Sequence, residues 1–148
     1  MKLPEITIQV KYKNSTEEKI IIDGAPKVVE VAQKIFNSDT IAWTEEVLML
    51  CLSRRNELVG YYKVSSGGMS ASIIDPKVVF TIALNSCAHG IIMLHNHPSG
   101  NLKPSEQDDL ITKRLRDSGK ILDIKLLDHI IIVPDGKYYS YANESSIL

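Results

Sequence analysis

Residues 91–108, IIMLHNHPSGNLKPSEQD, join a short apolar run to a polar loop and the start of a helix. The four apolar residues that open the stretch predict a buried strand, and the pattern from Ser105 onward is helical. Side chains two positions apart leave a strand on the same face, so His95 and His97 can converge on one point. Asp108 falls in the first turn of the helix, where its carboxylate can point back toward the two histidines.

Two imidazoles and a carboxylate form a common ligand set for catalytic zinc, which keeps a fourth position for water. We therefore predict that His95, His97 and Asp108 bind Zn²⁺. A competing interpretation stays open, because Ser105 and Asp108 also have the spacing of a helix-capping box. The two interpretations are compatible, since Ser105 can cap the helix while Asp108 binds metal. Asp109 points about 100° away around the helix and is not expected to be a ligand.

A catalytic zinc site usually needs a carboxylate that is not itself a ligand to act as the general base. Glu45 and Glu46 precede the apolar run at residues 47–52, which predicts a buried strand. Alternation along that strand puts the two carboxylates on opposite faces, so only one of them can face the metal. The residues alone leave open which one does, and whether either is more than a surface residue.

The rest of the chain interleaves predicted strands and helices. The predicted elements are strands at residues 6–11, 47–52, 57–64 and 91–94, helices at 27–37, 76–85 and 105–118, and two or three short strands between 121 and 141. Gly119 is expected to close the third helix. This alternation favours a single-domain α/β or α+β fold around a mixed sheet. We expect residues 1–43 to form an accessory strand and helix, and residues 44–148 to form the main domain.

The composition narrows the classes of function. The 148 residues carry a formal net charge of −1, whereas sequence-independent nucleic-acid binding needs many Lys and Arg contacts to phosphate. The basic residues Lys113, Arg114, Arg116 and Lys120 are interpreted as a solvated helix face. No segment has the apolar length of a signal peptide or a membrane span, so we expect a cytoplasmic protein with no membrane partner.

The two cysteines, Cys51 and Cys87, lie in apolar contexts and do not form a CxxC pair. Cysteine-based zinc binding is therefore unsupported. Two buried free thiols are favoured over a disulfide, because a reducing cytosol disfavours disulfides.

The spacing of the motif resembles that of a known superfamily. His95-x-His97, seven residues, Ser105, two residues and Asp108 match the metal motif of the JAB/MPN (JAMM) metalloproteases. The longer strings HNHPSGNLKPSEQDDLITKRL and GKILDIKLLDHIIIV look like the bacterial RadC family within that superfamily. The similarity covers about residues 44–142.

The resemblance implies a compact β–α–β domain with a mixed, curved sheet flanked by helices. It implies Zn²⁺ held by the same three ligands, and it makes Ser105 a partner for the tetrahedral intermediate or the metal-bound water. It also implies an acid–base glutamate, which the RadC pattern places at Glu45, although other JAMM branches would select Glu46.

Further features of the sequence lie outside the motif. His129 occupies a family position near the site, where it either orients a ligand or is a satisfied core histidine. His89 has no motif support and is interpreted as structural. Many RadC proteins carry an N-terminal helix-hairpin-helix region of the kind associated with DNA. Residues 1–43 lack its glycine-rich signature, which weakens a DNA-directed inference.

These observations favour a zinc-dependent hydrolase that cleaves an amide or isopeptide bond in an unknown peptide or protein substrate. One alternative is a DNA-repair-associated accessory protein or a metal-dependent nuclease, which would need a basic groove beside the metal. Another is a non-catalytic MPN scaffold, although such domains usually lack motif residues that this chain retains. The loops at residues 65–72 and 99–104 are expected to border the cleft, and the sequence leaves the oligomeric state open.

Overall fold

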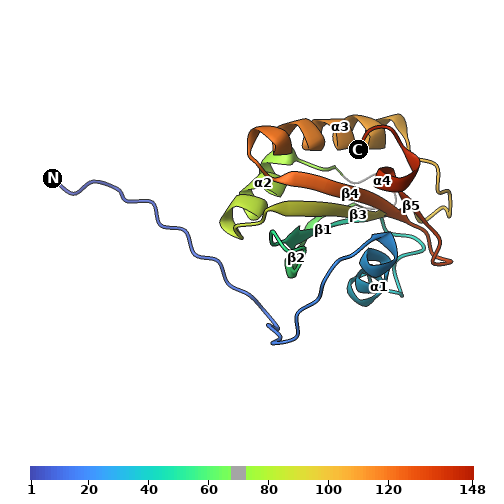
Figure 1. Cartoon of the computed structure of the whole chain (residues 1–148), viewed down its shortest axis with the longest axis horizontal. Coiled ribbons are helices and arrows are strands. Elements are labelled where there is room, and N and C mark those ends of the chain that lie inside the picture. Colours follow the sequence, from blue (N-terminus) through green and yellow to red (C-terminus); the bar gives the residue numbers. More distant parts are fainter. Residues whose placement is uncertain (68–72) are drawn as a thin grey trace.

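The computed structural model describes residues 1–67 and 73–148 and is built around a five-stranded mixed sheet (Figure 1). The strands lie in the order β2-β1-β3-β4-β5, in which β3 and β4 are parallel and the other neighbouring pairs are antiparallel. Their bounds are β1 Glu46–Leu52, β2 Leu58–Ser66, β3 Gly90–Asn96, β4 Lys125–Ile132 and β5 Tyr138–Ser140. The predicted mixed sheet is confirmed.

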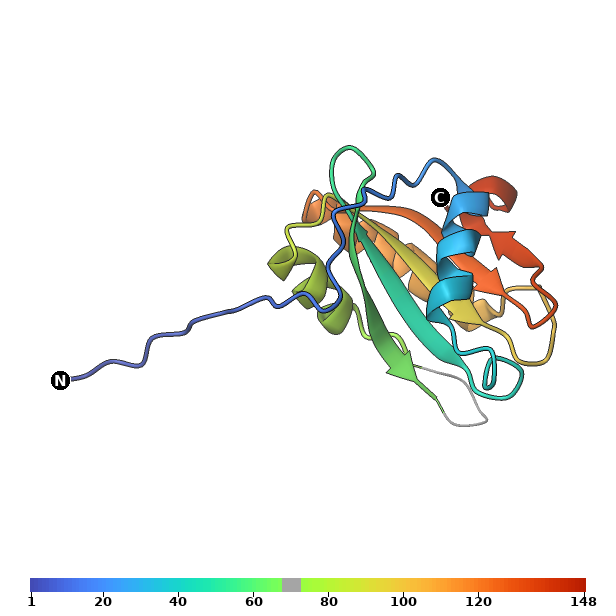
Figure 2. The ribbon, with the colours of Figure 1, turned by 90° about the horizontal axis from the view of Figure 1, so that it is seen from below.

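Helices cover both faces of this sheet. Their bounds are α1 Ala25–Ile35, α2 Pro76–Asn85, α3 Glu106–Ile121 and α4 Tyr141–Glu144. Helix α1 lies across one face, which Figure 2 shows from below, and α2 and α3 cover the other face (Figure 1). The helices predicted at residues 27–37, 76–85 and 105–118 are therefore confirmed to within a few residues. No helix of the described residues is long and apolar enough to cross a lipid bilayer.

The central strands β1 and β3 are buried along their whole length, which explains why they appear in the sequence as unbroken apolar runs. Even-numbered residues of β3, such as Leu94, pack into the apolar layer beneath α1. Odd-numbered residues, such as Met93, pack into the layer beneath α2 and α3. Because side chains alternate along a strand, His95 and His97 continue the second series and emerge on the face that α3 covers.

The N-terminal arm, residues 1–20, forms neither a helix nor a strand, so the strand predicted at residues 6–11 is wrong. A period-two apolar pattern makes a strand only where a neighbouring strand supplies hydrogen-bond partners, and the apolar side chains of this segment are exposed instead. The first β-bridge of the chain is at Ile21, which pairs with Glu57 just before β2. Helix α1 follows and packs into the core, while the division of the chain at residue 43 stays a prediction.

Both cysteines are free thiols, as predicted. Cys51 is buried in β1, and burial raises the pKa of its thiol. The prediction that Cys87 is also buried is wrong, because Cys87 is exposed in the turn after α2 and has a φ of 52°. The left-handed backbone there turns the chain back toward β3, and a thiol with apolar neighbours in sequence ends up facing solvent.

Gly119 lies inside α3, so the prediction that it closes the helix is wrong. The helix continues to Ile121 before the chain turns toward β4. A Cβ atom on residue 119 would collide with the carbonyl oxygen of Ile124. The missing side chain therefore allows α3 to approach the segment that leads into β4, which sets the position of the helix on the sheet.

Replacing Gly119 by alanine should lower the free energy of unfolding by about 1–3 kcal/mol, because the added methyl group forces the helix away from Ile124. Chemical denaturation of the metal-free proteins measures this change. Gly60→Ala is the matched control, since a Cβ there meets only the Tyr12 ring at an ordinary 3.6 Å. Wild-type stability in Gly119→Ala would contradict the close approach.

Candidate metal centre

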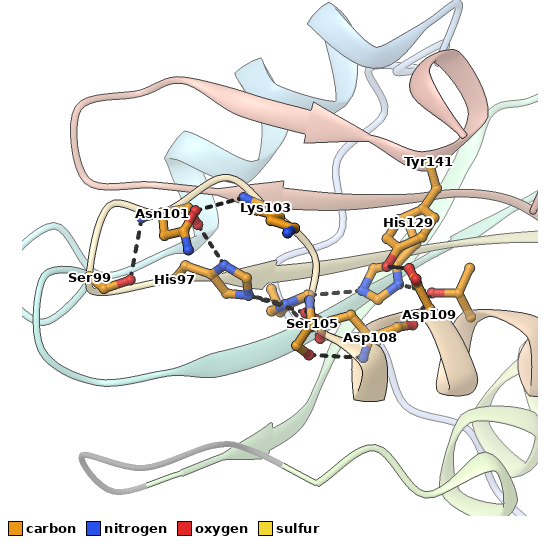
Figure 3. A network of polar contacts seen from close by, with 11 residues as sticks. His97, Ser99, Asn101, Lys103, Ser105, Asp108, Asp109, His129 and Tyr141 are labelled. Atoms are coloured by element: carbon orange, nitrogen blue, oxygen red, sulfur yellow. Dashed lines mark hydrogen bonds and ion pairs between the residues drawn. The ribbon is translucent and has the colours of Figure 1, made fainter. Parts of the chain in front are cut away.

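Three candidate ligands meet where β3 ends and α3 begins (Figure 3). One ligand atom each from His95, His97 and Asp108 lies within 4.8 Å of the other two. The Nε2 atoms of the two histidines are 2.9 Å apart. The carboxylate oxygens of Asp108 lie 3.3 Å from Nε2 of His95 and 3.5 Å from Nε2 of His97. The structure thus brings together the three residues that the sequence predicts as zinc ligands.

The other ring nitrogen of each histidine already has a partner. Nδ1 of His97 donates to the carbonyl oxygen of Asn101 over 2.7 Å, and Nδ1 of His95 lies 2.8 Å from Nε2 of His129. A carbonyl oxygen can only accept, so neutral His97 carries its hydrogen on Nδ1 and turns the Nε2 lone pair toward Asp108. Metal-binding histidines have this arrangement, and two imidazole nitrogens with a carboxylate oxygen fit Zn²⁺.

A capping box positions the carboxylate. Oγ of Ser105 accepts from the backbone N–H of Asp108 over 3.1 Å, and Oδ2 of Asp108 accepts from the backbone N–H of Ser105 over 2.7 Å. Oδ1 of the same carboxylate is the oxygen nearer to His95. The capping interpretation is therefore confirmed, and the cap holds the carboxylate where it faces the two imidazoles.

Burial and the mutual contacts of the cluster set its charge. Burial opposes ionisation of Asp108, but the neighbouring His95 and His97 outweigh burial and hold the pKa of the carboxyl well below its usual range. Burial also disfavours the charged form of His97, yet the contacts with Asp108 and the Asn101 carbonyl raise its pKa. A carboxylate kept anionic beside two imidazoles is the form in which this group binds a divalent cation.

The structure separates the two candidate general bases. Glu46 is only 8% exposed, and its carboxylate accepts a hydrogen bond from Nζ of Lys63 over 2.7 Å. Glu45 is half-buried and lines the same cleft as the three candidate ligands. Of the two candidates, Glu45 is therefore the one whose residue lines this cleft.

Asn96 holds the segment that carries Glu45. Its side chain is fully buried, and alternation along β3 puts it on the opposite face from the histidines. Nδ2 donates to the carbonyl oxygens of Ile41 and Thr44, and Oδ1 accepts from the backbone N–H of Glu46, each over 2.8 Å. Sequence analysis missed this role because the partners lie 50 to 55 residues away along the chain.

The candidate ligands open onto a cleft of about 590 Å³. Its lining outside the three ligands includes Glu45, Val47, Ile74, Pro98, Ser105 and Ile111. The loop at residues 99–104 borders the cleft, as predicted, through Ser99, Asn101 and Lys103. Of the second predicted border, residues 65–72, the part from 68 to 72 lies outside the described residues. Among the cleft residues that the structure describes, Lys103 is the one lysine or arginine.

The surroundings of His129 and Asp109 are resolved by the structure (Figure 3). His129 is fully buried on β4 and contacts His95, so it belongs to the surroundings of a candidate ligand. Burial, together with the nearby His95, lowers the pKa of His129 well below its usual value. Asp109 accepts a hydrogen bond from the Tyr141 hydroxyl over 2.7 Å, away from the ligand cluster.

We expect the purified chain to carry about one zinc ion per molecule, and His97→Ala to lose most of it, because two remaining ligands seldom retain the ion. Plasma mass spectrometry of untagged protein measures the metal content. Asp109→Asn is the matched control and should keep wild-type zinc, since the amide oxygen can still accept the Tyr141 hydrogen bond. Zinc that persists in His97→Ala but falls in Asp109→Asn would contradict the ligand assignment.

Comparison with known proteins places the chain in a family. A family model described as a RadC-like JAB domain matches residues 22–146. A UPF0758 protein of Flavobacterium johnsoniae is 44% identical over 100 residues, which are 68% of this chain and 43% of the relative. A UPF0758 protein of Methanosarcina barkeri is 41% identical over 103 residues, which are 70% of this chain and 44% of the relative.

A longer match extends over most of the chain. A UPF0758 protein of Chlorobaculum parvum is 33% identical over 141 residues, which are 95% of this chain and 61% of the relative. The chain thus spans less than two thirds of the length of each of these relatives. The matched residues 22–146 include every helix and strand of the described residues, from α1 to α4. The chain therefore belongs to the RadC-like JAB domain family.

Proposed function

We propose that this chain is a zinc-dependent hydrolase of the JAMM type that cleaves an amide or isopeptide bond in a peptide or protein. The main support is the placement of Glu45, a carboxylate outside the candidate ligand set, in the same cleft as the three ligands. Structural zinc sites are closed by four protein ligands, whereas catalytic sites use three and stay open to substrate. Three ligands facing a cleft, among the residues that the structure describes, favour the catalytic type.

His95, His97 and Asp108 would hold the ion. When bound, Zn²⁺ would supply Lewis acidity, which polarises a carbonyl group and allows water to act as a nucleophile near neutral pH. The chain's own part is to fix the ligands. The capping box orients Asp108, and the Asn101 carbonyl orients His97.

Glu45 would move a proton during this hydrolysis. Its carboxylate would accept a proton from water as the water oxygen forms a bond to the carbonyl carbon. It would then donate that proton to the amide nitrogen as the carbon–nitrogen bond breaks, which leaves a carboxylic acid and an amine. The hydrogen bonds of Asn96 to the backbone of Thr44 and Glu46, on either side of Glu45, support the position of this residue at the cleft.

Ser105 would stabilise the developing oxyanion. Its hydroxyl oxygen accepts the backbone N–H of Asp108, so the hydroxyl hydrogen is available for donation into the cleft that Ser105 lines. Donors aimed at the charge that develops in the transition state contribute strongly to catalysis. One serine can therefore cap α3 and assist the reaction.

The charge of the cleft supports an amide substrate over a phosphodiester. Nucleic-acid binding depends on several cationic contacts to phosphate, whereas the described cleft combines Lys103 with the carboxylate of Glu45. On the basic face of α3, Arg116 is bonded to Asp117 and to the carbonyl oxygen of Ile147. Neither feature supplies the basic groove that a nuclease would need.

Glu45→Gln should keep zinc and the fold but reduce hydrolysis roughly 10²–10⁴-fold, because the amide cannot accept the proton. The measurement is mass spectrometry of products released by zinc-loaded protein from peptide libraries, including peptides joined through a lysine side chain.

Glu46→Gln is the matched control for this variant. It should lose the contact with Lys63 and some stability, yet keep most of its activity. A larger loss of activity in Glu46→Gln than in Glu45→Gln would show that Glu46, and not Glu45, is the base. If the zinc-loaded wild type cleaves none of the peptides, the proposed function is overturned.

Ser105→Gly should change the free energy of unfolding by only a few tenths of a kcal/mol, because glycine is tolerated at a helix N-cap. Turnover should nevertheless fall roughly 10²-fold, since the oxyanion loses a donor. Paired denaturation and cleavage measurements separate the two roles. Ser99→Gly, which alters another serine of the cleft, is the control and should keep near wild-type turnover. Equal turnover in the two variants would remove Ser105 from the reaction.

A further inference from the structure

We propose that Thr112 and His129 are positioning residues that fix His95 in the tautomer whose Nε2 lone pair faces the metal. This inference rests on the proposed metal centre. It assigns a task to two buried polar side chains, neither of which is a candidate ligand.

The three side chains form a continuous hydrogen-bonded chain. Oγ1 of Thr112 lies 2.6 Å from the carbonyl oxygen of Asp108 and 2.6 Å from Nδ1 of His129. Nε2 of His129 lies 2.8 Å from Nδ1 of His95. This series of hydrogen bonds therefore runs from the backbone of one candidate ligand to the side chain of another.

Chemistry at one end sets the direction of every hydrogen bond. The Asp108 carbonyl can only accept, so the single hydroxyl hydrogen of Thr112 is donated to it. The Thr112 oxygen must then accept from Nδ1–H of His129, which leaves Nε2 of His129 as an acceptor. His95 consequently carries a hydrogen on Nδ1, and its Nε2, 2.9 Å from Nε2 of His97, is the nitrogen available to a metal.

Burial keeps this order of hydrogens in place. Thr112 and His129 are fully buried, and a second hydrogen on the His129 ring would put an unpaired charge in the core. The neighbouring carboxylate of Asp128 is bonded to the Ser140 hydroxyl and to the backbone N–H groups of His129 and Ala142. These three hydrogen bonds of Asp128 are with groups other than the His129 ring.

Packing fixes the plane of the His129 ring. Tyr141 stacks on it with ring centroids 5.2 Å apart and an angle of 12° between the planes. The Tyr141 hydroxyl donates to Asp109 over 2.7 Å, which ties the stacked pair to α3. His129 therefore has a defined ring orientation as well as a defined tautomer. Its hydrogen bond with Nδ1 of His95 fixes the orientation and the tautomer of the His95 ring in turn.

Long-range ¹H–¹⁵N spectra of the histidine rings in the metal-free wild type test the direction of the hydrogen bonds between Thr112, His129 and His95. We expect the neutral His129 ring to carry its hydrogen on Nδ1 with Nε2 unprotonated, and His95 to carry a hydrogen on Nδ1. A hydrogen on Nε2 of His129 would mean that the hydrogen bonds run in the opposite direction. That result would overturn the inference without reference to metal binding.

Zinc affinity, measured by chelator competition, tests the consequence. Thr112→Val removes the hydroxyl at nearly constant volume and should weaken zinc binding about 10-fold or more, as loss of a partner to a metal-bound histidine does. Thr112→Ser keeps the hydroxyl and should restore both affinity and the His129 tautomer. Thr81→Val, at an exposed position on α2, is the matched control and should bind as wild type.

The outcomes separate this inference from the proposed function. A wild-type chain that binds no zinc would overturn the proposed function and this inference with it. Full zinc affinity and an unchanged His129 tautomer in Thr112→Val would overturn this inference alone. If Thr112→Val fails to fold, the wild-type spectra and the Thr112→Ser affinity still decide.

Discussion

The alternation of side chains along β3 is the constraint on which the site depends. β3 pairs with β1 on one side and β4 on the other and is buried at every position, so its register cannot shift without moving apolar side chains out of both layers. His95 and His97 therefore face α3, while Asn96 faces the segment before β1. A slip of one residue would exchange these roles and separate the ligands from Asp108.

The second ligand-bearing element is placed independently of the first. Two features position α3, namely the capping box at its start and the close approach of Gly119 to Ile124 near its end. Thr112 lies between them and links the helix to His129 on β4. The candidate ligands thus come from a strand and a helix whose relation is fixed by the core, which is the arrangement that a precise metal geometry requires.

The local parts of this site could be predicted from the sequence, and the long-range parts could not. The spacing of His95 and His97 and the cap at Ser105 are local consequences of strand and helix periodicity. Thr112 stands four residues after Asp108 and could have been found on the same helical face. The partners of Asn96 and His129 depend on strand register between distant segments, which no local pattern reveals. The same limit explains the strand wrongly predicted at residues 6–11, because its pattern lacks a neighbouring strand.

Buried polar groups favour a working centre over a structural remnant. Burying an amide, a hydroxyl or an imidazole costs free energy unless each is hydrogen-bonded, and apolar residues of similar shape would pack as well. The chain nevertheless buries Asn96, Thr112 and His129 together, each with partners that orient a candidate ligand or the segment carrying Glu45. The partners of these groups include, or lie next to, residues that line one cleft, which is expected if their geometry serves chemistry there, whereas stability alone gives no reason for this arrangement.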